Sequence, residues 1–143
     1  MTLRSCFSCG DAAGMVRFDD ETFVVEHAGM KTKVPSLSGW RCSACGEVEF
    51  DHESALAYAK AADELVLRAR AMQSEELRRI RRKLHLTQVM ASNLTGGGHN
   101  AFSRYERGEA EPVSAVVNLF RILDRHPELL AEIEPSCTDT VIA

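Results

Sequence analysis

Two pairs of cysteines constrain the fold of this chain more than any other feature. Cys6 and Cys9 lie in "CFSCG", and Cys42 and Cys45 lie in "CSACG". Each C-x-x-C unit points two thiolates at one ion from a tight turn, and the glycine that follows lets the backbone curl under the sulfur atoms. Together the four cysteines predict one metal site, in a module too small to fold on its apolar core alone.

Zinc is the metal that best suits a tetrahedral set of four thiolates. Because four cysteines leave no position for water, we expect one structural Zn²⁺ per chain. An iron centre of the rubredoxin kind, serving a redox enzyme, is the alternative. His27 and His52 could replace a ligand, but each is expected to be an ordinary surface histidine. The N-terminus lacks the apolar stretch of a secretory signal, so we expect a cytoplasmic protein with reduced thiols.

The segment between the cysteine pairs has the composition of short β-strands. The β-rich runs cover residues 15–18, 22–27 and 30–34, and residues 47–50 suggest another short strand. A helical pattern follows from residue 52 to residue 72. Trp40, close to Cys42, is expected to cap the metal core rather than to bind a ligand.

Charge is distributed unevenly along the 143 residues, whose overall net charge is −4. Residues 1–67 carry 6 Lys/Arg and 11 Asp/Glu, whereas residues 68–107 carry 9 Lys/Arg and 3 Asp/Glu. An acidic half and a basic segment indicate two modules with different partners. No apolar run is long enough to cross a membrane, so no membrane partner is expected.

The basic segment has the pattern of a helix-turn-helix. Ser74 is expected to cap a helix with Leu77, Ile80 and Leu84 on one side. Thr87 is expected to cap a short helix over residues 88–94. Three glycines then form a turn before a helix over residues 100–107, with Phe102 and Tyr105 in the core and Gly108 at its end.

The spacing of four and three between Asn100, Arg104 and Arg107 places these residues on one face of the last helix. Asn can pair with adenine and Arg with guanine, so Asn100 and Arg104 are the predicted base-reading residues. An ordinary exposed polar face is the alternative. The predicted phosphate contacts are Gln88, Ser103, Arg107 and, from the preceding arginine run, Arg79 and Arg82. His99 is interpreted as a hinge residue or a neighbour of phosphate.

Longer motifs carry a family resemblance. "LTQ…AS…GGGHNAFSRYERG…EP" resembles the helix-turn-helix of the Cro/phage-repressor (XRE) superfamily. The order of C-x-x-C, C-x-x-C, "RRKLHLTQ", "GGGHNAFSRYERG" and "RILDRHPELLAEI" resembles the MqsA (YgiT) antitoxin family from Cys6 to about Ile133. The resemblance implies a zinc module that binds a ribonuclease toxin and a second module that dimerises and binds operator DNA. It also implies Cys6, Cys9, Cys42 and Cys45 as metal ligands, with Asn100 and Arg104 reading bases.

The sequence therefore predicts an α+β protein with a zinc-binding module and an all-α helix-turn-helix domain. The expected boundaries are 1–68 for the zinc and toxin-binding module, 69–75 for a linker, 76–134 for the DNA-binding and dimerisation domain, and 135–143 for a disordered tail containing a spare thiol, Cys137. The expected function is a non-enzymatic antitoxin that represses its own operon at a palindromic operator as a homodimer. A zinc-containing transcription regulator without a toxin partner is the alternative.

Overall fold

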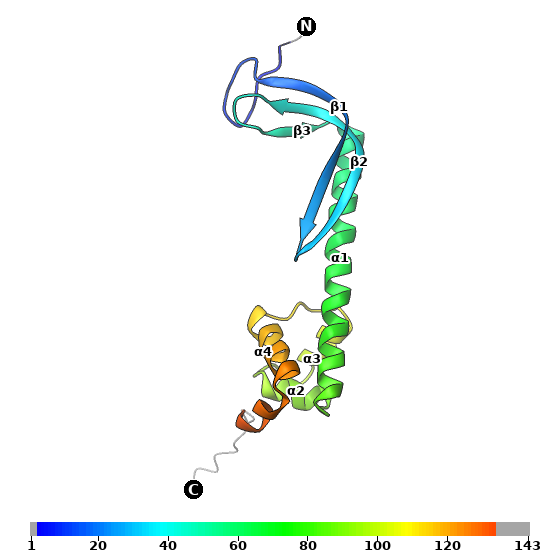
Figure 1. The fold of residues 1–143 in the computed structure, drawn as a ribbon, viewed down its shortest axis with the longest axis vertical. Helices are drawn as coiled ribbons and strands as arrows, with labels where there is room; N and C mark the ends of the chain where they lie inside the picture. Colours follow the sequence, from blue (N-terminus) through cyan, green and yellow to red (C-terminus); the bar gives the residue numbers. More distant parts are fainter. Residues whose placement is uncertain (1–2, 134–143) are drawn as a thin grey trace. The chain divides into compact units, whose positions relative to one another are not determined.

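The computed structural model describes residues 3–133, and the chain divides into two compact units, Met1–Ala69 (unit 1) and Arg70–Ala143 (unit 2). Unit 1 contains a three-stranded antiparallel sheet in the order β1-β2-β3, followed by the first part of a long helix, α1 (His52–Lys83) (Figure 1). Unit 2 contains the rest of α1 and the shorter helices. The tail predicted over residues 135–143, including Cys137, lies outside the described residues.

The sheet is more continuous than the sequence indicated. The two runs expected at 15–18 and 22–27 form one strand, β1 (Met15–His27), and β2 (Met30–Cys42) extends well beyond residue 34. At residues 19–21, between the two expected runs, the strands pair through an irregularity between the pairs Phe18↔Gly39 and Phe23↔Val34. Asp20 has a φ of 55° there, and its backbone N–H donates to Ser38 Oγ. A bulge therefore replaces the expected break.

The third strand, β3 (Val48–Phe50), confirms the short strand expected near residues 47–50. It pairs with β2 from Gly39↔Phe50 to Arg41↔Val48. Helix α1 begins directly after it, because Asp51 Oδ1 accepts the backbone N–H of Ser54 at 3.0 Å and so caps the first turn. The face of α1 that packs on the sheet carries Leu65, which lies in the core of unit 1. That core contains Val25, Val34, Leu37 and Leu65.

Helix α1 runs without a break through residues 69–75, where the sequence suggested a linker. The expectation that Ser74 caps a new helix is therefore wrong. Its hydroxyl instead donates to the backbone oxygen of Tyr105 at 2.8 Å, inside unit 2. The sequence could not separate the two possibilities, because a serine followed by an apolar helical pattern is compatible with either a cap or a helix interior.

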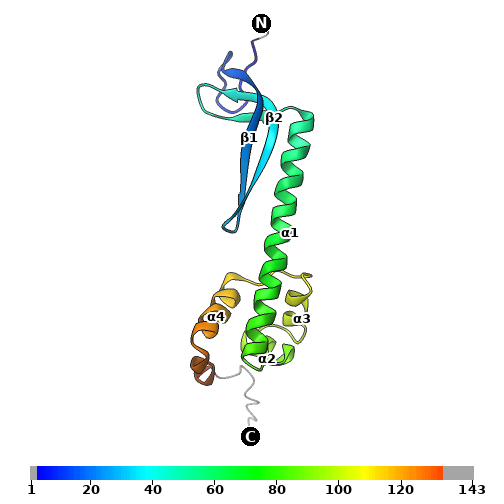
Figure 2. The ribbon, with the colours of Figure 1, turned by 45° about the vertical axis from the view of Figure 1, so that its right-hand side comes forward.

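Unit 2 packs four helices and a final 3₁₀ turn around one apolar core (Figure 2). Leu77, Ile80 and Leu84 of α1 are buried as predicted. The remaining elements are α2 (Gln88–Leu94), α3 (Ala101–Glu106), α4 (Ser114–Arg125) and η1 (Pro127–Glu132). Phe102 of α3 and Phe120 of α4 are fully buried, with ring centroids 4.8 Å apart. Helix α4 ends at Arg125, and Pro127 begins the separate η1 turn.

The mixture of a small antiparallel sheet with helices confirms the α+β class. No helix within residues 3–133 is both long enough and apolar enough to cross a membrane.

Candidate metal centre and nucleic-acid interface

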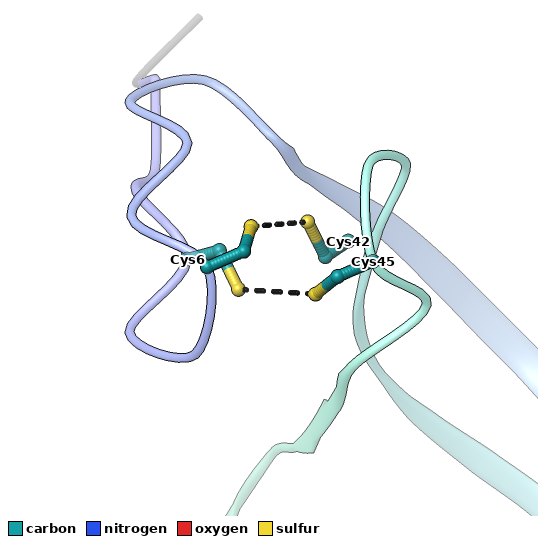
Figure 3. A group of neighbouring side chains, drawn as sticks. Cys6, Cys42 and Cys45 are labelled. Carbon is teal, nitrogen blue, oxygen red and sulfur yellow. Dashed lines mark hydrogen bonds between the residues drawn. The ribbon is translucent and has the colours of Figure 1, made fainter.

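The four predicted ligands come together at one end of the sheet. The Sγ atoms of Cys6, Cys9, Cys42 and Cys45 all lie within 4.8 Å of one another. Cys6 and Cys45 are 3.7 Å apart, as are Cys9 and Cys42, so the close pairs join one loop to the other (Figure 3). Four thiols this close, from two loops, form a single metal-binding group. His27 and His52 are exposed and do not belong to it.

We call residues 6–10 the first knuckle and residues 42–46 the second knuckle. In each of them the glycine N–H donates to the carbonyl of the first cysteine, at 3.0 Å from Gly10 to Cys6 and 2.9 Å from Gly46 to Cys42. Both glycines have a φ of +79°, in the left-handed region that side chains disfavour. The sequence thereby fixes two matching turns that present their sulfur atoms to one point.

The pKa values of two of the thiols are shifted in opposite directions. Backbone N–H groups of Cys45 and Ala44 stabilise the Cys42 thiolate and lower its pKa to about 7. For Cys45, a backbone N–H of Glu47 acts in the same direction, but burial and the three neighbouring cysteines outweigh it and raise its pKa to about 12. Four thiolates at this distance repel one another, so a bound divalent ion is needed to hold them all deprotonated. The donor set fits zinc.

Trp40 packs against the metal centre, as predicted. Its half-buried ring lies beside a cluster of Cys6, Met15 and Cys42. The guanidinium carbon of Arg4 lies 4.0 Å from the ring centroid, and that of Arg17 lies 4.7 Å away. The indole thereby shields the sulfur atoms from water on this side, and stacked arginines cover the indole.

In unit 2, α2 and α3 are joined by the glycine turn that the sequence predicted. Thr87 caps α2 by accepting the backbone N–H of Met90 at 3.1 Å. Gly97 allows the two helices to approach closely, since a Cβ at this position would lie 2.8 Å from the Cβ of Ala101. The Ser92 hydroxyl accepts the backbone N–H of Phe102 at 3.0 Å and links α2 to the buried start of α3.

The two predicted base-reading residues are both exposed. Asn100 is the residue before α3, and Arg104 lies one helical turn later. Asn100 Oδ1 lies 3.0 Å from Nδ1 of the adjacent His99, so the side chain interpreted as a hinge residue or phosphate neighbour also contacts Asn100. Phe102 and Tyr105 point into the core on the opposite face, which fixes the outward orientation of Arg104.

Glu106 is a buried carboxylate that the sequence reasoning missed. Its carboxylate accepts hydrogen bonds from Arg81 Nε and Nη2 and, at 2.9 Å, from Gln88 Nε2. Burial raises the pKa of Glu106, but the hydrogen bonds of Arg81 and Gln88 outweigh it and hold the pKa below the ordinary value. One residue thus joins α1, α2 and α3. The sequence feature that could have indicated its burial is its position four residues after Phe102, which places both residues on the same face of α3.

The residues predicted to contact phosphate differ in their surroundings. Arg79 forms a bidentate pair with Asp124 at 3.1 and 2.8 Å, and Arg107 pairs with Glu109 at 3.0 Å. Gln88 donates to Glu106, and Ser103 is half-buried. Arg82 is exposed and has no ion-pair partner among residues 3–133. The arginine run is therefore partly neutralised from within the unit, which its sequence alone did not indicate.

The sequence of this chain is similar to those of known proteins. A protein-family model described as "Antitoxin component of bacterial toxin-antitoxin system, MqsA" matches residues 4–134. The chain belongs to the MqsA antitoxin family. The Antitoxin MqsA of Escherichia coli (strain K12) is similar to it, with 41% identity over 107 residues that cover 73% of this chain and 82% of the relative. Membership of the MqsA family gives the chain an antitoxin role and implies a toxin partner. The match to the family model spans both the cysteine knuckles and the α2–α3 pair.

Proposed function

We propose that this chain neutralises a ribonuclease toxin through unit 1 and represses its own operon through unit 2. The observation that carries the proposal is the separation of the two kinds of surface along one chain. Unit 1 holds the four-thiol centre in an acidic segment, and unit 2 exposes Asn100 and Arg104 on a rigid helix pair in a basic segment. The acidic segment favours a basic partner, and the basic segment favours a nucleic acid.

For DNA, the proposed reading element is α3. Asn100 would bond the N6 and N7 edge of adenine, and Arg104 would bond O6 and N7 of guanine. The buried partners of this helix, Phe102 and Glu106, hold its backbone in place, which reduces the entropy lost on binding. Gln88 keeps one amide N–H for a phosphate, because Glu106 takes only the other. Arg82, Ser103 and Arg107 would complete the phosphate contacts.

A two-fold operator would require a dimer of this chain. Ile122 of α4 and Val113, which precedes it, are exposed apolar residues of unit 2, at 47% and 63%. They support a two-fold contact through unit 2, away from the core that Phe120 and Leu123 fill. We therefore propose a homodimer on a palindromic site.

For the toxin, the proposed binding element is the zinc-loaded unit 1. Residues 1–67 have a net charge of −5, which suits a ribonuclease whose own surface must attract RNA. Strand β1 is an outer strand of the sheet, so the part of its edge that follows Met15 can add a strand from a partner through main-chain hydrogen bonds. One Zn²⁺ at the four cysteines would hold both knuckles and the start of β1 in place without taking part in any reaction.

The operator half of the proposal is tested by substitution in α3. Asn100→Ala and Arg104→Ala should each lose about 1–3 kcal/mol at the operator and keep most non-specific affinity. Fluorescence anisotropy with operator and scrambled duplexes measures both quantities. Ser114→Ala, an exposed change at the start of α4, is the control. Variants that still prefer the operator as strongly as the unaltered chain would show that α3 does not read the sequence.

A further inference from the structure

The first knuckle presents an aromatic side chain to solvent. Phe7 is 87% exposed and Leu3 is 79% exposed, the two highest values among the large apolar side chains of residues 3–133. Both are adjacent to a residue of the metal centre or of its cap, namely Cys6 and Arg4. Water contact over a whole phenyl ring is unfavourable, and the other phenylalanines of residues 3–133 are buried or half-buried.

We propose that Phe7 is the apolar anchor through which unit 1 binds its toxin. This inference rests on the toxin-binding role proposed above and names the residue that carries it. The partner surface is a pocket lined with apolar side chains and rimmed by basic ones. Aromatic anchors that enter such pockets dominate the binding energy of protein interfaces.

The backbone around Phe7 is fixed before any partner arrives. The N–H of Cys6 donates to the carbonyl of Asp11 at 2.9 Å, and that of Gly10 donates to Cys6 at 3.0 Å. Cys6 is itself buried against Met15 and Trp40. Because the backbone on either side of Phe7 is held in this way, little besides the rotation of its own side chain is lost on binding.

The anchor lies at the end of a sheet edge that has further apolar surface. The backbone N–H of Met15 donates to the carbonyl of Arg4 at 3.3 Å, which joins the segment before the first knuckle to the first residue of β1. The next residue of this outer strand, Val16, is 57% exposed. Leu3 and Val16 therefore place further exposed apolar side chains next to the two residues that this bond joins.

The charges around Phe7 select a basic protein. Arg4 pairs with Glu49 and stacks on Trp40, so its positive charge is already balanced by a carboxylate. Asp11 and Glu47, which follow the two knuckles, are exposed and make no ion pair within residues 3–133. Uncompensated carboxylates directly after the two knuckles disfavour nucleic acid, whose phosphates they would repel, and favour a cationic protein surface.

The test uses the full-length, zinc-loaded chain and the purified toxin of the same operon in a calorimetric titration. Phe7→Ser should weaken toxin binding by about tenfold or more, and Phe7→Leu should restore most of the affinity. Leu56→Ser is the matched control, because it removes an exposed large apolar residue of unit 1 from the surface of α1 and should change affinity less than twofold. Zinc content and circular dichroism confirm that each variant is folded.

Four outcomes would overturn the inference. If the Phe7→Ser variant bound toxin as tightly as the unaltered chain, Phe7 would not be the anchor, although toxin binding itself would stand. A 12-nucleotide labelled single strand that binds the unaltered chain but not Phe7→Ser would identify nucleic acid as the partner. A dimer that becomes monomeric in sedimentation with Phe7→Ser would identify a second copy. Absence of toxin binding by the unaltered chain would refute the proposed function, and the anchor with it.

Discussion

The two units hold themselves together by different means, although they divide the chain almost equally. The core of unit 2 has nine buried residues, including Phe102 and Phe120, and one buried carboxylate with its own hydrogen-bond partners. The core of unit 1 has four buried residues, including Leu37. The buried cluster at its knuckle end consists of Cys6, Met15 and Cys42. A helical unit with this core can fold on apolar burial, whereas the knuckle end depends on a cation.

The largest effect should come from removing a ligand. Cys42→Ser, or a strong chelator, should unfold the knuckles and most of the sheet, because without the ion nothing joins the two knuckles and the apolar cluster beside them is small. Amide NMR should lose the dispersed signals of residues 4–50 and keep those of α2, α3 and α4. Ser8→Ala, within the first knuckle but not a ligand, should bind one equivalent of zinc and keep every signal.

The converse change should damage only unit 2. Phe120→Ala removes a fully buried ring and should lower the free energy of unfolding of unit 2 by about 3–5 kcal/mol. Urea denaturation followed by circular dichroism at 222 nm measures this loss. Zinc stoichiometry and the signals of the sheet should stay unchanged. A parallel loss of metal would show that the two units are not independent.

An effect no larger than this, but with a characteristic pH dependence, is expected at Glu106. Its pKa in the folded protein lies below the ordinary value of 4.5, so its stabilising contribution is complete above that value and is lost as the pH falls below it. Thermal unfolding of unit 2 between pH 7 and pH 3 should show this decline. Glu106→Gln should destabilise unit 2 at pH 7 by up to about 3–5 kcal/mol, because Arg81 loses its charged partner. The stability that unit 2 loses between pH 7 and pH 3 should be smaller in Glu106→Gln than in the unaltered chain. The same dependence of stability on pH in both proteins would contradict the role of this carboxylate.

The smallest effect distinguishes two arginines of the same helix. Arg82→Ala should reduce the salt dependence of operator binding by about one counterion, since this side chain has no internal partner among residues 3–133. Arg79→Ala should reduce it less, because Asp124 already neutralises Arg79 at 2.8 Å. Affinities measured from 50 to 200 mM salt give both slopes. Equal slopes would mean that DNA displaces Asp124 from Arg79.

Local chemistry was enough to predict much of the fold and of the metal centre. C-x-x-C spacing with a following glycine leaves few alternatives for Cys6, Cys9, Cys42 and Cys45, and Thr87 before an apolar helical pattern identified the start of α2. Features that depend on distant contacts were missed. The bulge at Asp20 depends on Ser38, and the helical state of Ser74 depends on packing with Tyr105. Similarly, Glu106 acquires its role from Arg81 and Gln88, which are 25 and 18 residues away in sequence.

The roles of the exposed residues remain predictions for a different reason. Asn100, Arg104 and Arg82 make few contacts within the chain, so neither sequence pattern nor packing determines what they bind. Their proposed partners are outside the molecule, and only binding measurements can assign them.

The central claim is that one chain keeps toxin binding and DNA binding in separately stabilised units. The most direct measurement adds a chelator stepwise to the full-length chain while recording affinity for the toxin and for operator DNA in parallel. We expect toxin binding to disappear as zinc leaves the four cysteines, with operator affinity changed by less than about twofold. Toxin binding that survives complete zinc loss, or operator binding that falls in step with it, would contradict the claim.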